Sequence, residues 1–146
     1  MLLLAILGQA CANTPSAEGR WQLEAGRNVA TARIEPRPKA WLGLFCFRGS
    51  PQRLFLEVSP TLHGQGGTAE LPLEFRVPGR GRYVLSFQGS SAWQHTQLYP
   101  DHPLVEDLQR GRQLQLAVPG RDTLVTVSLT GSRAIIQALL AFCTDG

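Results

Sequence analysis

The chain has 146 residues, of which 43% are hydrophobic and 17% are charged. This length and balance fit one globular domain with its own core, and they exclude a disordered or fibrous protein. The formal net charge is +3, but the basic residues are scattered along the sequence and nearly all are arginines, with Lys39 the only lysine. Because nucleic-acid-binding proteins usually cluster their basic residues, we expect no nucleic-acid partner, only weak attraction to anionic envelope polymers.

The N-terminal end resembles a secretory signal peptide. Its first eight residues form an apolar run that is too short to span a bilayer, which needs about 20 residues. The run leads into Ala10-Cys11-Ala12, a small-x-small cleavage pattern. We therefore expect residues 1–12 to be a signal peptide, 13–19 a flexible leader and 20–146 a single β-sandwich domain. A buried N-terminal strand is the alternative.

Cys11 leaves two localisations open. Cleavage after Ala12 would give a periplasmic or secreted protein, whereas lipidation of Cys11 would anchor the protein to a membrane. We favour cleavage, because Gly8 stands where a lipobox prefers leucine. A membrane is expected as a partner only if Cys11 is lipidated.

Cys46 and Cys143 are the two cysteines that remain once Cys11 has left with the signal or has taken a lipid. In an oxidising compartment, two such cysteines predict one disulfide. A reactive thiol would need a partnered histidine, and neither cysteine lies in a recognisable catalytic signature. The expected bond would fasten the C-terminal helix onto the sheet.

Apolar alternation and turn residues predict a series of short strands. In chain order, strands are expected at 19–24, 27–35, 40–47, 53–59, 68–77, 83–87, 112–118 and 122–129. The run 40–47 is apolar almost throughout, which indicates a central strand that is buried on both faces. Pro72 favours an edge position or a bulge for its strand.

The segment that begins near Ser132 is the only strongly helical one, with an apolar face that includes Ile136, Leu139 and Cys143. A shorter helical turn is expected at 104–110. About nine short strands and one terminal helix predict an all-β fold, a β-sandwich or flattened barrel of about 8–9 antiparallel strands with one C-terminal α-helix. We expect this helix to cover Trp41 and Phe45.

The segments 60–67 and 89–103 are expected to be loops, and the second is the least regular part of the chain. Its aromatic residues, together with nearby arginines, form the expected binding surface, because Trp, Tyr and Arg are enriched at binding hot spots. The members of this surface are Trp93, His95, Tyr99, Arg76, Arg80 and Arg82. The alternative is that Trp93 and Tyr99 simply cover one end of the core.

No catalytic constellation is expected. His95, Asp101 and His102 match no zinc or calcium spacing, so we expect no metal and no other cofactor. The nucleophile elbow Gly-x-Ser-x-Gly is absent from the sequence. Glu106 with Asp107, or Glu70 with Glu74, are candidates for paired glycosidase acids. Only their proximity supports this interpretation, and the positions of Glu70 and Glu74 beside a proline predict a solvated strand face. A non-enzymatic protein is the expectation that remains.

Four short motifs follow one another in the order typical of small envelope proteins. They are Gly19-x-Trp21, Trp41-Leu-Gly-Leu-Phe-Cys46, Leu73-Glu-Phe-Arg-Val-Pro-Gly-Arg80 and Val127-Ser-Leu-Thr-Gly-Ser-Arg-Ala-Ile135, the last before a terminal cysteine. This order resembles the type VI secretion-associated accessory proteins of the VasI type, in which a strand cysteine pairs with one after the last helix. The closing Leu129–Ala134 motif is also similar to the end of invasion-associated locus B proteins. Either resemblance implies a non-enzymatic periplasmic domain that assists a larger envelope machine or modulates surface interactions.

We therefore expect an exported accessory or binding module of the bacterial envelope, which the first resemblance associates with type VI secretion. Its expected partner is an envelope or secretion-apparatus protein. The alternative is an inhibitor-like domain that presents the segment 89–103 to a periplasmic or foreign hydrolase. An enzyme acting on the cell wall is the third interpretation, and the oligomeric state is left open.

Overall fold

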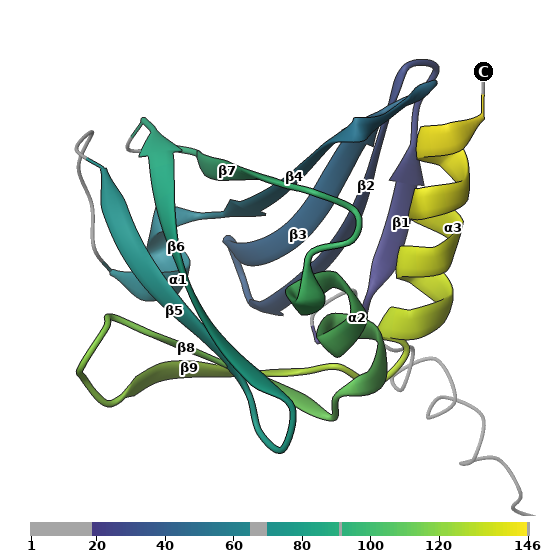
Figure 1. The fold of residues 1–146 in the computed structure, drawn as a ribbon. Helices are drawn as coiled ribbons and strands as arrows, with labels where there is room; N and C mark the ends of the chain where they lie inside the picture. The colour runs from purple at the N-terminus through teal and green to yellow at the C-terminus, as the bar shows by residue number, and fades with distance from the viewer. Residues whose placement is uncertain (1–18, 65–69, 91, 146) are drawn as a thin grey trace, which may run out of the picture.

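The computed structural model describes residues 19–64, 70–90 and 92–145, which contain nine strands and three helices (Figure 1). The strands are β1 (Gln22–Ala25), β2 (Val29–Arg37), β3 (Ala40–Phe47), β4 (Ser50–Val58), β5 (Leu71–Val77), β6 (Gly81–Gly89), β7 (Gln94–Leu98), β8 (Gln113–Ala117) and β9 (Thr123–Ser128). The helices are α1 (Pro60–His63), α2 (Pro103–Arg110) and α3 (Ser132–Thr144). The predicted all-β fold with a C-terminal helix is confirmed.

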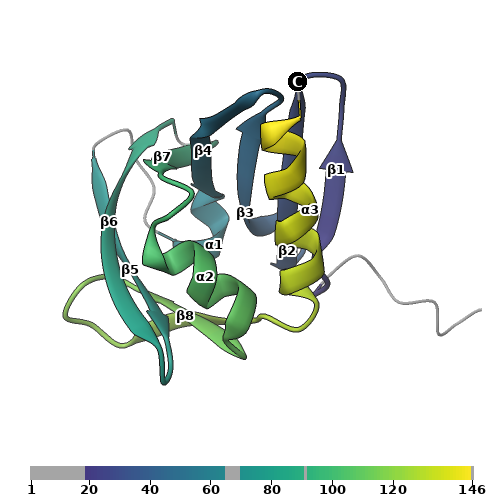
Figure 2. The ribbon, with the colours of Figure 1, turned by 45° about the vertical axis from the view of Figure 1, so that its right-hand side comes forward.

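The strands form one sheet in the order β1-β2-β3-β4-β7-β6-β5-β8-β9, and every neighbouring pair is antiparallel. The sheet curves around a single core but does not close, since β1 and β9 stand at its two ends. Trp21 links these ends, because its indole Nε1–H donates to the carbonyl oxygen of Ser128 at 2.9 Å. The result is a flattened, sandwich-like shape in which α2 and α3 lie side by side (Figure 2).

The disulfide between Cys46 and Cys143 is confirmed, with an S–S distance of 2.07 Å. Cys46 lies on the inner face of β3, and Cys143 lies on the buried side of α3 together with Ile136 and Leu139. The helix packs against β1 to β4, which form the first half of the sheet (Figure 1). The bond therefore joins the last helix to the third strand of the fold.

The expectation that α3 covers Trp41 and Phe45 is wrong. Successive side chains of a strand point to opposite faces, so Leu42, Leu44 and Cys46 face the core while Trp41 and Phe45 face outward. Phe45 is nevertheless 8% exposed, because other aromatic rings cover it on the outer face. The apolar residues of β3 thus contribute to the core on one face of the sheet and to a layer of aromatic rings on the other.

The prediction of a loop over 89–103 is also wrong. Its centre is β7, which pairs with β4 along its whole length, from Leu54 opposite Leu98 to Val58 opposite Gln94. β7 also pairs with the end of β6, and it thereby joins the two halves of the sheet. The centre of the segment is consequently fixed within the sheet.

Two smaller expectations also change. The predicted loop 60–67 begins with helix α1, whose first residue is Pro60, and its last part lies outside the described residues. β5, which carries Pro72, is not an edge strand, because it pairs with β6 on one side and β8 on the other. Pro72 fits there because β8 pairs only with Glu74 to Arg76, so the proline lies beyond the end of β8.

The predicted signal peptide, the flexible leader up to residue 18 and the lipidation candidate Cys11 lie outside the described residues. Within the described part of the chain, no helix has the length and apolar character needed to cross a membrane.

Candidate functional site

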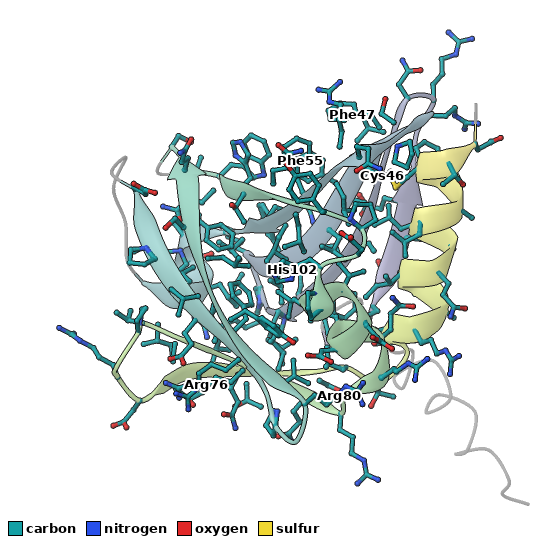
Figure 3. The ribbon with its side chains drawn as sticks, in the orientation of Figure 1. Cys46, Phe47, Phe55, Arg76, Arg80 and His102 are labelled. Carbon is teal, nitrogen blue, oxygen red and sulfur yellow. A yellow bond between two sulfur atoms is a disulfide. The ribbon has the colours of Figure 1, made fainter. Side chains whose placement is uncertain are left out.

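The predicted binding residues separate into two groups at opposite ends of the molecule. Figure 3 shows Arg76 and Arg80 at one end and Phe47 and Phe55 at the other. Trp93 belongs with the aromatic group that contains Phe47 and Phe55, because its ring lies 5.7 Å from that of Phe45, which contacts both of them. The single surface predicted from the sequence is therefore wrong, and each group has to be considered by itself.

The first group is an aromatic face on the outer side of β3, β4 and β7. It consists of Phe45, Phe47, Phe55, Trp93 and His95. Phe45 and Phe55 are direct cross-strand partners, and their rings stack with centroids 4.9 Å apart. Trp93 stacks on His95 at 4.2 Å and lies 5.7 Å from Phe45. Strand register thus brings the rings together into one layer.

Part of this face is open to solvent. Trp93 is 38% exposed, and Phe47 and Phe55 are half-buried. The guanidinium carbon of Arg53 lies 4.3 Å from the centre of the Phe47 ring, in a cation–π arrangement. The aromatic face therefore offers the residue types that dominate binding hot spots.

A buried carboxylate holds Trp93 in place. Glu57 is only 4% exposed, and its Oε2 accepts a hydrogen bond of 2.8 Å from the indole Nε1–H of Trp93. Its Oε1 pairs with Nη2 of Arg33 at 2.9 Å, so both oxygens are engaged. Arg33 reaches Glu57 across β3 at Gly43, the residue directly opposite both of them. Glu57 was missed in the sequence because an acid between apolar residues looks like an ordinary solvent-facing strand position.

The histidines predicted near this face play separate structural roles. His95 packs between Trp93 and Phe55 on β7. His102 caps helix α2, because its Nδ1 accepts from the backbone N–H of Leu104 at 3.1 Å, and its ring lies edge-on to Tyr83. Among the described residues, no group of three His, Cys, Asp or Glu side chains is placed to hold a metal ion.

A buried histidine supports β7 from the core side. The Nε2 of His63 and the Oε1 of Gln94 are 2.7 Å apart, and both side chains are almost fully buried. Burial lowers the pKa of His63, and the hydrogen bond with Gln94 offsets this only in part. The folded protein therefore favours the neutral form of this imidazole.

Stability is expected to fall as the pH drops from about 7 toward 5. The unfolded chain binds a proton near the ordinary pKa of 6.5, which buried His63 resists, so acid favours the unfolded state. One proton limits the slope to about 1.4 kcal/mol per pH unit. Urea unfolding of wild type, His63→Gln and His102→Asn at several pH values measures this slope. His63→Gln should remove it and His102→Asn should keep it, whereas an equal slope in all three proteins would contradict the assignment.

The second group lies on the hairpin formed by β5 and β6. The prediction that Glu74 is solvated is wrong, since it is 3% exposed, whereas Glu70 is exposed as expected. Oε2 of Glu74 pairs with Nη2 of Arg76 at 2.7 Å, and Oε1 pairs with Nε of Arg82 at 3.0 Å. The hydrogen bond from Arg76, aided by both positive charges, holds the pKa of Glu74 below its usual range.

Arg80 is held in the same way by helix α2. Its Nε pairs with Oδ1 of Asp107 at 2.9 Å, while Oδ2 accepts a 2.5 Å hydrogen bond from the hydroxyl of Tyr83. Asp107 is 7% exposed. The hydrogen bond to this carboxylate and the burial of the ring raise the pKa of Tyr83 to about 12. Tyr83 is thus a fixed hydrogen-bond donor near neutral pH.

In both groups, buried carboxylates accept hydrogen bonds from side chains of the protein itself. Glu57 holds an arginine and an indole, and Asp107 holds an arginine and a phenol. Tyr99, the remaining member of the predicted surface, follows β7 with 58% exposure and takes part in none of these contacts between described residues. Comparison of the chain with protein-family models, with curated proteins and with solved structures found no match.

Proposed function

We propose that this chain is an exported, non-catalytic binding module of the bacterial envelope that docks a partner protein on its aromatic face. The observation that carries the proposal is Trp93, a part-exposed indole held against Phe45 and His95 and hydrogen-bonded to buried Glu57. A carboxylate placed in this way has both oxygens engaged, so it serves to position an aromatic side chain.

The rigidity of this face favours binding. An aromatic ring offers a large contact area, and a ring that is already fixed loses little conformational entropy when a partner docks. Trp93 is fixed by one hydrogen bond and two ring contacts, and Phe55 by the rings on either side of it. Arg53 adds a positive charge at the border of the face.

An oxidising compartment and an envelope partner fit the rest of the molecule. The bond between Cys46 and Cys143 is typical of exported proteins, and the apolar run with a cleavage pattern at residues 1–12 points the same way. The resemblance to type VI secretion-associated accessory proteins then makes a component of that apparatus the partner class that we propose. Because β7 holds residues 94–98 within the sheet, the partner contacts a surface and not an inserted loop.

Trp93→Ala is expected to weaken partner binding by about 30-fold, since a central hot-spot residue contributes about 2 kcal/mol. The partner would be captured from envelope extract of the host bacterium with the mature, oxidised protein and identified by mass spectrometry. The affinity of the purified pair would then be measured by titration calorimetry.

Leu124→Ala is the matched control, because Leu124 is 41% exposed on β9, outside the aromatic face. It should leave the affinity unchanged. Equal losses for Trp93→Ala and Leu124→Ala would contradict the proposed surface. Capture of a single hydrolase that the protein inhibits would favour the inhibitor-like alternative, and turnover of purified peptidoglycan would contradict a non-catalytic role.

A further inference from the structure

Arginines that are scattered in the sequence come together at the end of the fold opposite the aromatic face. Arg76, Arg80 and Arg82 belong to the β5–β6 hairpin, Arg110 ends α2, and Arg112 precedes β8. Because β5 pairs with both β6 and β8, these distant positions become neighbours. We call these five residues the arginine patch; the expectation of a scattered positive charge does not hold for them.

The patch surrounds two hollows at the turn of the β5–β6 hairpin, and Pro78 and Arg80 line both of them. The first has a volume of about 380 Å³ and is lined by Pro78, Arg80, Arg110, Gly111, Arg112 and Gln113. The second has a volume of about 470 Å³ and is lined by the hairpin residues 76–82 together with Gln115. Arg80 lines both, and neither hollow has an acidic residue in its lining. The two hollows are therefore positively charged and share one arginine.

Buried carboxylates set the orientation of the arginines from below. Asp107 holds Arg80 through Nε, and Glu74 holds Arg82 through Nε, so neither ion pair uses the terminal Nη atoms. Asp107 and Glu74 are 7% and 3% exposed, which places their negative charges behind the hollows. Arg112 has an exposed side chain and takes part in no ion pair between described residues. Guanidinium donors are thus available where a ligand would enter.

We propose that the two hollows bind a ligand carrying more than one phosphate group. Each hollow is lined by three arginines, whereas a carboxylate brings one charge and two oxygens. A phosphate monoester brings a charge of about −1.5 to −2 and three acceptor oxygens, and arginine binds phosphate with two parallel hydrogen bonds. Because Arg80 lines both hollows, a ligand with two phosphates can occupy them together. This inference stands apart from the proposed function, since it concerns the opposite end of the molecule.

Titration calorimetry of the mature, oxidised protein with inorganic tripolyphosphate tests the proposal. We expect saturable binding at about 0.15 M salt, where exposed charges separated by more than about 8 Å are largely screened. Arg110→Gln/Arg112→Gln should weaken this binding by about tenfold or more, because charge-assisted hydrogen bonds are lost. Neither of these residues holds a buried carboxylate, so the variant should fold normally, as circular dichroism would check.

The matched control is Arg27→Gln/Arg133→Gln, which removes the same charge from exposed positions outside the patch. It should change the affinity less than twofold. The proposal of a phosphate site would be overturned if both double variants weakened tripolyphosphate binding equally, or if citrate bound as tightly as tripolyphosphate. If a single-stranded oligonucleotide bound more tightly than tripolyphosphate, the proposal of a small phosphate ligand would be overturned. Binding to vesicles containing phosphatidylinositol bisphosphate, whose headgroup carries several phosphates, but not to vesicles of phosphatidylcholine, with the same dependence on Arg112, would support the site and identify its ligand as a lipid headgroup.

Discussion

Replacing Cys143 by serine is expected to lower the free energy of unfolding by about 4 to 5 kcal/mol, the largest effect of any single change considered. The bond spans 97 residues, so its loss frees a long loop in the unfolded chain. It also leaves a hydroxyl and a thiol at two positions that are 1% and 0% exposed. Helix α3 would keep its apolar contacts but lose its covalent attachment to β3.

The melting temperature of Cys143→Ser should fall by roughly 10 to 20 °C, as differential scanning calorimetry would measure. Cys46→Ala/Cys143→Ala is the control that removes the bond without burying a hydroxyl, and the wild type in reducing agent is a second reference. Binding to the aromatic face should survive at low temperature, because Phe45, His95 and Glu57 hold Trp93 in place and all three belong to the sheet. A loss below about 1 kcal/mol, or free thiols in the protein purified without reducing agent, would show that the bond contributes little.

The sequence predicts those elements in which local pattern and burial agree. Strands β2 and β3 alternate between apolar core positions and outer positions, and α3 has an apolar face that ends at Cys143. The disulfide follows from cysteine count and the expected compartment, so it needs no knowledge of strand order. The strands and the helix are predicted from residues close together in the sequence, and the disulfide is predicted from the number of cysteines.

β7 was not predicted because one of its buried side chains is polar. Its sequence, Gln94-His-Thr-Gln-Leu98, has one apolar residue, yet Gln94 and Leu98 are both buried. The side chain of Gln94 is accommodated because His63, from another element, offers it a hydrogen bond. An apolar–polar alternation cannot reveal a strand whose core residue is polar and satisfied by a distant partner.

Neither surface could be assembled from the sequence, since both depend on strand order. The arginine patch needs β5 to lie between β6 and β8, and the aromatic face needs β7 to lie beside β4. Residue types alone could not divide the candidates: Trp93 and Arg80 were predicted to share one surface, and the fold separates them. The positioning roles of Glu57 and Asp107 were not predicted, because the partners of Glu57 lie 24 and 36 positions away in the sequence and those of Asp107 lie 24 and 27 positions away.

Gly43→Ala is expected to lower the free energy of unfolding by about 2 to 4 kcal/mol, the second largest effect. A Cβ at Gly43 would lie 2.5 Å from the carbonyl oxygen of Ala32 and 3.2 Å from Cα of Arg33. Strands β2 and β3 would have to separate, and Arg33 would lose its path across β3 to Glu57. Because Glu57 is buried, it would then keep only the indole hydrogen bond from Trp93.

Two controls separate the steric effect from the lost ion pair in urea unfolding experiments. Arg33→Met removes the ion pair without a steric conflict; since the Arg33 side chain is 29% exposed, the loss should be about 1 kcal/mol. Gly26→Ala adds a Cβ that lies 3.4 Å from its nearest neighbour, so its effect should stay within about 0.5 kcal/mol. We expect Gly43→Ala also to shift the emission of Trp93, because the carboxylate that orients the indole loses its second partner. The result that would contradict this explanation is a loss of unfolding free energy for Gly43→Ala no larger than that for Arg33→Met. The ion pair would then not depend on the missing side chain at position 43, and the ring contacts alone would hold the aromatic face.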